Sequence, residues 1–164
     1  MNLQELKHSK AFSLIELLVV IVVIGILAAV VVPNTIMAGD TARVAAAGED
    51  LRAIEKAIEG YRNKTGKWPL NASTAVLPTE LESYFTKSNP FDKVTPIGGM
   101  YDYDGTSGTR GPLIKVVGTS GNAVVADATL LQLDEEMDDG DLSTGRIIKA
   151  SGQIHYYIVP ADAP

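Results

Sequence analysis

An uninterrupted apolar run from Leu17 to Val32 is the sequence feature that most constrains how this chain folds. With Phe12, Leu14 and Ile15 it approaches the roughly 20 residues that a helix needs to cross about 30 Å of hydrocarbon. We therefore expect a single transmembrane helix that is retained as an anchor. A removed signal peptide is the alternative, but the apolar run of a signal peptide is only about 7–15 residues long.

Basic residues precede this run at Lys7 and Lys10, with His8 between them. Positive flanks of a membrane helix stay in the cytoplasm. The expected topology is a cytoplasmic N-terminus with the body of the chain on the other side of the membrane.

The stretch KAFSLIELLVVIVVIGILAAVVVPN, which starts at Lys10, resembles the start of type IV prepilins and type II secretion pseudopilins. These precursors have a basic leader, a small residue before the cleavage site, then Phe, and Glu as the fifth residue of the mature chain. The resemblance implies cleavage between Ala11 and Phe12, N-methylation of Phe12, and Glu16 as that fifth residue. Ala11 departs from the commoner Gly.

The resemblance also implies partners and a location. A prepilin peptidase would remove residues 1–11, and an inner-membrane assembly platform would polymerise the mature chain with other pilin-like subunits. The helix would contact membrane lipid, and the head would be periplasmic, or at the cell surface in a pilus.

Glu16 is the only acid within the apolar segment of residues 12–38, and a charge at mid-membrane is unfavourable by roughly 2.5–3.5 kcal/mol on insertion scales. Cleavage after Ala11 would create an ammonium on Phe12, and residues four apart share one face of a helix. Glu16 would then pair with its own amine or, as the resemblance implies, with that of a neighbouring subunit. The alternative is that Glu16 reaches the membrane interface on its own.

Gly25 and Pro33 are the other candidate assembly residues. Both residue types are common in membrane helices, which alone would explain them. Proline lacks an amide hydrogen and crowds the preceding turn, so Pro33 weakens the helix there. The resemblance implies that this segment can extend inside a filament.

Beyond this segment, apolar residues recur at steps of three and four, which predicts an amphipathic helix over residues 41–64. Its apolar face is Val44, Ala47, Leu51, Ile54, Ile58 and Tyr61, and its solvated face is Arg52, Glu55, Lys56 and Glu59. Gly66 and Pro69 end it. We expect one helix of roughly 50 residues whose second half belongs to a head at residues 39–164.

Short β-branched runs separated by turn residues predict three to five antiparallel strands on the apolar face of this helix. The expected elements are a short helix at 77–85, a strand at 100–103, a hairpin of 113–117 with 123–126, and a hairpin of 146–149 with 153–159. The fold class is therefore α+β, and the resemblance implies that it is the pilin fold.

The stretch LDEEMDDGDLSTGR is dense in acids. It is not an EF-hand loop, because Met137 occupies a ligand position and Arg146 replaces the final Glu. We favour a helix end or a turn, with Gly140 in the left-handed conformation and the acids in water. Calcium held by Asp138, Asp139 and Asp141 is the alternative, since pseudopilins of the G type carry a calcium loop near the C-terminus. We expect no other cofactor.

Composition and motifs argue against enzymes and nucleic-acid binding. The chain has no cysteine, two histidines and a formal net charge of −6, which is unsuited to a nucleic-acid backbone. It lacks a G-x-S-x-G elbow and a phosphate-binding P-loop. His155 lies in a strand-like alternation, where packing is the expected role.

The resemblance predicts that the protein is a structural subunit of a type II secretion pseudopilus. The absence of cysteine and the KTGKWP turn, which starts at Lys64, favour a pseudopilin over a type IV pilus subunit, since many such subunits carry a C-terminal disulfide. The second alternative is a singly anchored periplasmic binding domain that does not polymerise.

Overall fold

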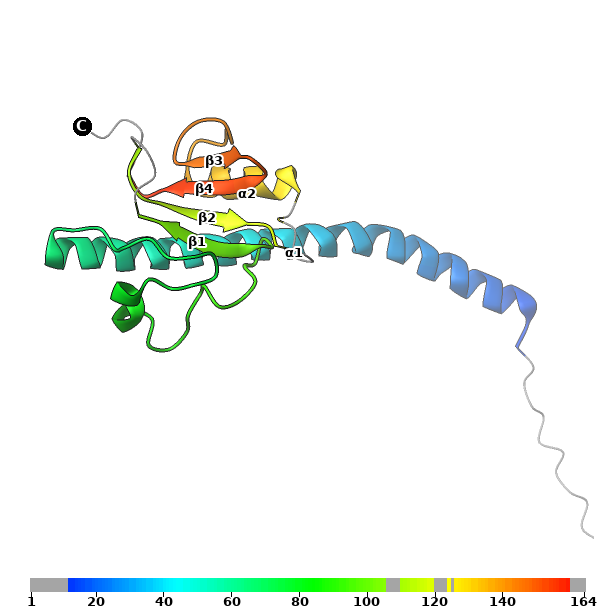
Figure 1. Ribbon diagram of the computed structural model, residues 1–164. Helices are drawn as coiled ribbons and strands as arrows, with labels where there is room; N and C mark the ends of the chain where they lie inside the picture. Colours follow the sequence, from blue (N-terminus) through cyan, green and yellow to red (C-terminus); the bar gives the residue numbers. More distant parts are fainter. Residues whose placement is uncertain (1–11, 106–109, 120–123, 125, 160–164) are drawn as a thin grey trace, which may run out of the picture. The chain divides into compact units, whose positions relative to one another are not determined.

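The computed structural model describes residues 12–105, 110–119, 124 and 126–159, with the side chains of residues 30–38 excepted (Figure 1). The chain divides into two compact units, Met1–Gly39 and Asp40–Pro164, and we refer to the second as the head. The predicted leader, residues 1–11, lies outside the described residues.

Helix α1 runs from Leu14 to Thr65, 52 residues, which confirms the expected single long helix. It ends where Gly66 takes the left-handed conformation at φ 70°, and the Gly66 amide donates to the Arg62 carbonyl at 2.7 Å. Glycine is favoured at this position because it has no Cβ to clash. No helix in the described part of the chain is long and apolar enough to cross a membrane.

The head contains one antiparallel sheet of four strands in the order β1-β2-β4-β3. The strands are β1 (Met100–Asp104), β2 (Leu113–Val117), β3 (Ile147–Ala150) and β4 (Gln153–Tyr157). The predicted C-terminal hairpin is confirmed as β3 and β4. Its two-residue turn places Ser151 at φ 52° and Gly152 at φ 75°, as a type I′ turn requires.

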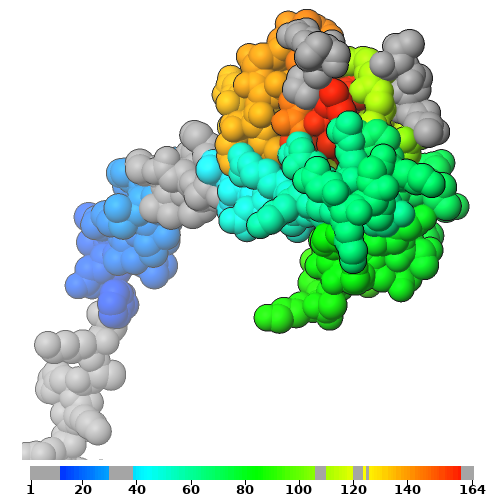
Figure 2. Space-filling model, turned by 90° about the vertical axis from the view of Figure 1, so that its left-hand side faces the viewer, coloured from blue at the N-terminus to red at the C-terminus, as the bar shows by residue number. Residues whose placement is uncertain are grey.

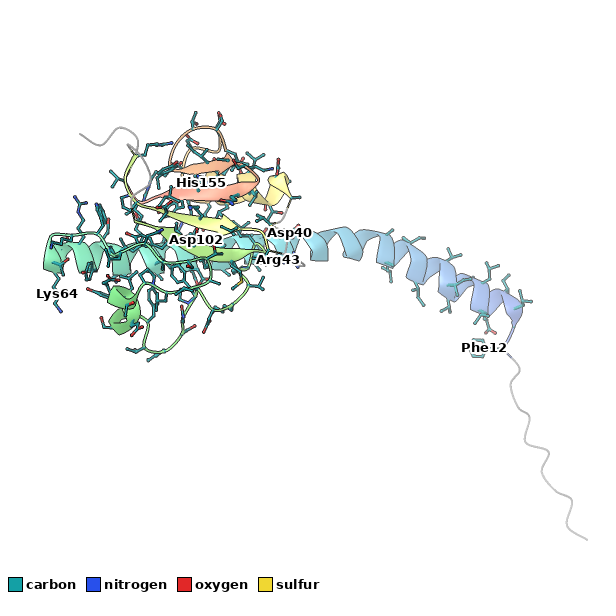
Figure 3. All side chains as sticks on the ribbon, in the orientation of Figure 1. Phe12, Asp40, Arg43, Lys64, Asp102 and His155 are labelled. Carbon is teal, nitrogen blue, oxygen red and sulfur yellow. The ribbon has the colours of Figure 1, made fainter. Side chains whose placement is uncertain are left out.

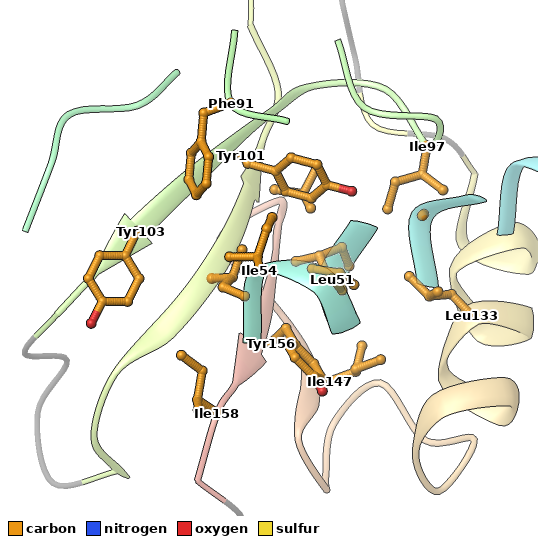
Figure 4. Close-up of a cluster of buried hydrophobic side chains, with 14 of the residues drawn as sticks. Leu51, Ile54, Phe91, Ile97, Tyr101, Tyr103, Leu133, Ile147, Tyr156 and Ile158 are labelled. Carbon is orange, nitrogen blue, oxygen red and sulfur yellow. The ribbon is translucent and has the colours of Figure 1, made fainter. Parts of the chain in front are cut away.

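One row of side chains crosses the whole sheet and builds the core. Tyr103, Ile114, Tyr156 and Ile147 are successive cross-strand partners, and none is more than 2% exposed. They belong to one buried cluster with the apolar face of α1 (Figure 4). The predicted helix face is confirmed, with Tyr61 half-buried at its edge.

The long connection between α1 and β1 is irregular except for the 3₁₀ helix η1 (Thr79–Tyr84), which confirms the short helix expected at 77–85. Leu81 of η1 is fully buried in the core. The connection also adds Phe91, whose ring packs edge-to-face on Tyr101 with centroids 6.1 Å apart. These contacts fix the connection to the head.

The hairpin predicted at 113–117 with 123–126 is wrong. Strand β2 pairs with β1 and β4, and the described residues Val124 and Ala126 lie in no strand. Ala126 instead precedes helix α2 (Asp127–Met137), of which the sequence predicted only a helix end, as one of two interpretations of the acidic stretch. Ala126 provides no side-chain cap, and the start signal that the sequence does carry is Asp127, an acid in the first turn.

The solvated role expected for Glu55 is also wrong. Its carboxylate accepts the Tyr156 hydroxyl at 2.7 Å and pairs with the Arg146 guanidinium. Arg146 also donates to the carbonyls of Tyr157 at 2.9 Å and Ile158 at 3.1 Å, and lies 4.7 Å from the centroid of the Tyr156 ring. Glu55 therefore joins α1 to the C-terminal hairpin.

Replacing Glu55 by Ala should destabilise the head, because Arg146 and the Tyr156 hydroxyl would lose their shared partner. The side chains of Glu55 and Arg146 are 17% and 23% exposed, so we expect a loss of about 2–3 kcal/mol. Denaturant unfolding of the full chain in detergent measures it. The control Glu59→Ala, exposed on the same helix, should change stability by less than about 0.5 kcal/mol. Equal losses would show that Glu55 has no special role.

Candidate functional site

The N-terminal candidate residues lie at the start of α1, except Ala11, which is outside the described residues. Phe12 is 78% exposed. Oε2 of Glu16 accepts the Ser13 backbone amide at 2.9 Å, and the Ser13 hydroxyl accepts the Ile15 amide at 3.3 Å. This reciprocal arrangement is a capping box, in which a Ser and a Glu three residues later satisfy the free amides of a helix start.

The capping box is visible in the sequence as S-L-I-E, a local signal that the prediction of a role for the Glu16 charge did not include. In this chain Phe12 is still joined to its leader, so its nitrogen is an amide and not an ammonium. The structure therefore places the carboxylate within one turn of the predicted cleavage site. It does not test the pairing with a Phe12 amine.

The rest of this segment presents apolar surface on all sides. Every described side chain from Phe12 to Ala29 is exposed. A Cβ built on Gly25 would meet nothing within 4 Å, so this glycine leaves an open notch in the helix surface. Pro33 lies within α1, and its side chain is outside the description. An apolar surface of this kind is typical of a segment that needs a lipid or protein partner.

The acidic candidates lie at the end of α2 and in the loop that follows it. Carboxylate oxygens of Asp134, Asp138 and Asp139 all lie within 4.8 Å of one another. Asp134 is fully buried, and neither of its oxygens has a hydrogen-bond partner among the described residues. Burial, together with the nearby carboxylates of Asp139, Asp138 and Asp141, raises the pKa of Asp134 to about 6, although the backbone amide of Gly140 lowers it.

Hydrogen bonds within the loop hold the other acids in place. Oδ2 of Asp138 accepts the backbone amides of Arg146 and Ile147, the latter at 3.0 Å. Asp139 accepts the Asp141 amide at 3.0 Å through one oxygen, and the Thr144 hydroxyl at 2.8 Å through the other. The loop is thus a structured turn.

Two glycines allow this turn. Gly140 has φ 80°, as expected from the sequence. Gly145 has φ 65°, and a Cβ there would clash with Oδ2 of Asp138. Both positions therefore favour glycine, one by backbone conformation and the other also by close approach.

The three acids proposed from the sequence are not one cluster. Asp141 is outside the group, and one of its oxygens accepts the Ser143 hydroxyl at 2.6 Å and the Ser143 amide at 3.0 Å. Asp134 takes its place and was missed, because it lies in the part of α2 that was not predicted. Oxygen ligands are those that calcium prefers, so the buried, unpartnered Asp134 with Asp138 and Asp139 fits that cation.

The outer face of the sheet carries a second group of polar residues, and Asp102 and His155 are labelled in Figure 3. Lys115 lies between them in register, with its ammonium 3.3 Å from Asp102 and 3.2 Å from Asp104. Burial lowers the pKa of His155, as does the nearby Lys115 charge. The His155 ring packs edge-to-face on Tyr157 with centroids 6.4 Å apart, consistent with the expected packing role.

Known proteins share both the N-terminal motif and the fold of this chain. Residues 6–32 match the prokaryotic N-terminal methylation motif. The major type IV pilin PilA1 from Clostridium difficile has a similar structure, with a TM-score of 0.55 and 17% identity, over 73% of this chain and 96% of the pilin. This similarity confirms the predicted α+β pilin fold.

Relatives in sequence indicate a more specific family than the structural similarity does. This chain is 33% identical over 120 residues to the type II secretion system core protein G of Pseudomonas aeruginosa, across 65% of this chain and 80% of that protein. The core protein G of Klebsiella michiganensis is 32% identical over 99 residues, 60% of this chain and 63% of that protein. That of Aeromonas hydrophila is 36% identical over 63 residues, 38% of this chain and 44% of its own length. The resemblance read from the N-terminal residues is thus confirmed, and this chain belongs to the family of the type II secretion system core protein G.

Proposed function

We propose that this protein is a structural subunit of a type II secretion pseudopilus. The observation that carries the proposal is an apolar helix segment, exposed from Phe12 to Ala29, with a single carboxylate in its first turn. The relatives described above are named for type II secretion, and the chain shares the N-terminal methylation motif. We therefore prefer a pseudopilus subunit over a type IV pilus subunit, for which the structural similarity supports only the shared fold.

Processing and location follow from this proposal. A prepilin peptidase removes residues 1–11 and the new N-terminus at Phe12 is methylated. Residues 12–38 anchor the chain in the inner membrane and, through an assembly platform, pack against other pilin-like subunits. Residues 39–164 form the periplasmic head.

Glu16 has a defined role in this assembly. Cleavage gives Phe12 an ammonium, and the attraction between two full charges strengthens as the surrounding dielectric falls, whereas the Ser13 amide that Glu16 caps is neutral. The ammonium of a neighbouring subunit would therefore displace the Ser13 amide from the Glu16 carboxylate when water is excluded. Each incoming subunit is matched to its neighbour by this one contact.

We further propose that the head binds calcium through Asp134, Asp138 and Asp139. Three converging carboxylates repel one another, and burying Asp134 without a partner is unfavourable. A divalent cation would relieve both effects and supply the fully buried oxygens with a partner. Calcium would fix the loop between α2 and β3, while the head's core supplies the rest of its stability.

Cleavage is tested at Ala11. The variant Ala11→Leu should leave an uncleaved precursor, because in this family only small side chains fit beside the scissile bond. Ala11→Gly is the matched control and should mature at least as fast as the wild type. Intact mass of the membrane-extracted chain measures both, and shows whether the mature chain starts at a methylated Phe12. Normal maturation of Ala11→Leu would place the cleavage site elsewhere.

The role of Glu16 is tested by separating capping from pairing. Glu16→Gln keeps an oxygen for the Ser13 amide but removes the charge, whereas Ser13→Ala keeps the charge and removes the capping hydroxyl. We expect Glu16→Gln to insert but not to polymerise, because an unpaired buried ammonium is unfavourable by about 3–5 kcal/mol. Ser13→Ala should polymerise.

Crosslinking between cysteines placed at Leu17 and Val20 reports helix contact directly, since the chain has no cysteine of its own. Undiminished ladders from Glu16→Gln would mean that the carboxylate acts only as a cap.

Calcium binding is tested by the melting temperature of the full chain in detergent. Without metal, ionising Asp134 opposes folding, because its pKa of about 6 in the folded chain lies above the ordinary value of 3.8. Its contribution to stability is therefore lost as pH rises from about 4 through 6. At pH 7, calcium at 100 times its Kd should restore about 2.7 kcal/mol.

Asp134→Asn should remove both the pH dependence and most of the calcium effect. The adjacent exposed Glu135→Gln is the control and should retain both. An unchanged melting temperature at millimolar calcium would refute the site.

A further inference from the structure

Helix α1 begins next to the proposed cleavage site. Leu14 is its first residue, and Phe12 and Ser13 belong to no helix or turn. Phe12 is 78% exposed. Figure 3 labels its side chain beside the first turn of α1, and Figure 2 shows the blue side chains of this segment at the surface. What fixes the start of the helix therefore also decides whether Phe12 lies inside or outside it.

Ser13 and Glu16 hold the backbone amides at the start of α1. The Ile15 amide donates to the Ser13 hydroxyl at 3.3 Å, and the Glu16 and Leu17 amides donate to the Ser13 carbonyl at 3.1 and 3.2 Å. The Ser13 amide in turn donates to Oε2 of Glu16 at 2.9 Å. Ser13 is therefore the N-cap of α1, the residue at which the ladder of helical hydrogen bonds begins.

The amide that the Ser13 hydroxyl occupies has a second possible partner. In a helix each amide donates to the carbonyl four residues earlier, so a longer α1 would join the Ile15 amide to the Ala11 carbonyl. Hydrolysis at the proposed site adds water to that carbonyl carbon and breaks its bond to the Phe12 nitrogen, which takes up a proton and leaves as an amine. Proteolysis acts on segments that are exposed and locally open, and a carbonyl bonded within a helix is neither.

The sequence around the site contains no backbone signal that would stop the helix. Residues 1–24 include neither proline nor glycine. The leader also holds a run of residues that favour helices, Leu3, Gln4, Glu5, Leu6 and Lys7. Ser9 and Asn2 are the next residues of a capping type towards the N-terminus, and a helix that began at either would include the scissile bond. The start of α1 after Phe12 therefore depends on Ser13 and its partner Glu16.

We propose that Ser13 is a positioning residue for cleavage: its hydroxyl holds the Ile15 amide, and this keeps the Ala11 carbonyl out of the helix and free for the peptidase. The inference rests on the proposed processing and gives Ser13 a role before assembly, whereas the proposed ion pair of Glu16 forms after cleavage. Glu16 supports Ser13 at this stage by accepting its backbone amide. Ser13→Ala chains that are cleaved keep the Glu16 carboxylate, so they should still polymerise.

Cleavage of the full-length precursor in detergent by a purified prepilin peptidase tests this role, with intact mass measuring the loss of residues 1–11. Ser13→Ala should raise KM about fivefold and leave kcat unchanged, because only the fraction of precursor with a free carbonyl can bind. Ser13→Thr keeps a capping hydroxyl and should be cleaved like the wild type. Adding Leu14→Pro to Ser13→Ala should restore KM, because proline at the first helical position disfavours helix at the residue before it. Leu14→Pro alone is the control and should leave KM unchanged.

Carbon-13 chemical shifts of Ala11 and Phe12 in the same precursors report the conformation at the site. They should move toward helical values in Ser13→Ala and return when Leu14→Pro is added. A higher KM without this change in shifts would mean that the peptidase recognises the Ser13 hydroxyl itself, and an unchanged KM would mean that the start of the helix does not control cleavage. Either result overturns the inference and leaves the proposed processing intact. A wild-type precursor that is not cleaved between Ala11 and Phe12 would refute the processing itself.

Discussion

The packing of one face of α1 against one row of the sheet is the interaction on which the head depends. Ile114 and Tyr156 lie at the centre of that row, and Leu51 and Ile54 are fully buried in the same cluster. Burial of a large aliphatic side chain contributes about 1.5–3 kcal/mol, so a few such residues exceed the net stability of many domains. The connection that carries η1 and helix α2 both add side chains to this core, and their described buried side chains belong to this one cluster.

Arg146 extends that dependence to the acidic loop. Its backbone amide is held by Asp138, and its side chain is held by Glu55 of α1. Arg146, which immediately precedes β3, therefore connects the acidic loop to α1. A change in the charge at Asp138 acts on the start of β3 directly and, through the position of Arg146, on the contact with α1. This chain of contacts explains why a surface turn can matter to the stability of the core.

Periodicity predicted the parts of the fold that depend on local pattern. The apolar face of α1 and the C-terminal hairpin were both readable, because three-to-four spacing and a turn signal are properties of neighbouring residues. Glu55 was misread because its partners lie about 90 and 100 residues further along the chain. A charged residue on a helix looks solvated until the fold brings a cation to it. The capping box was a local signal that went unused.

The acidic loop shows the same limit at a candidate site. Leu130, Leu133 and Met137 have helical spacing, but no capping side chain precedes them and acids dominate the segment. Without the helix, the sequence could not show that Asp134 is buried while the acids next to it are exposed. Its burial, and the exclusion of Asp141 from the cluster, follow from how α2 packs on the core and not from the composition of the loop.

In the proposed assembly, the Glu16 carboxylate would serve two states without conflict. As a cap it satisfies a backbone amide, a contribution of about 0.5–2 kcal/mol that also favours an anion near the positive end of the helix dipole. In a filament that excludes water, leaving an ammonium unpaired would be unfavourable by about 3–5 kcal/mol. The proposed exchange from cap to ion pair is therefore expected to be favourable only where neighbouring helices cover the segment. In an isolated chain with its first turn exposed to water, we expect the amine to stay hydrated and the cap to persist, so that assembly itself would release Glu16.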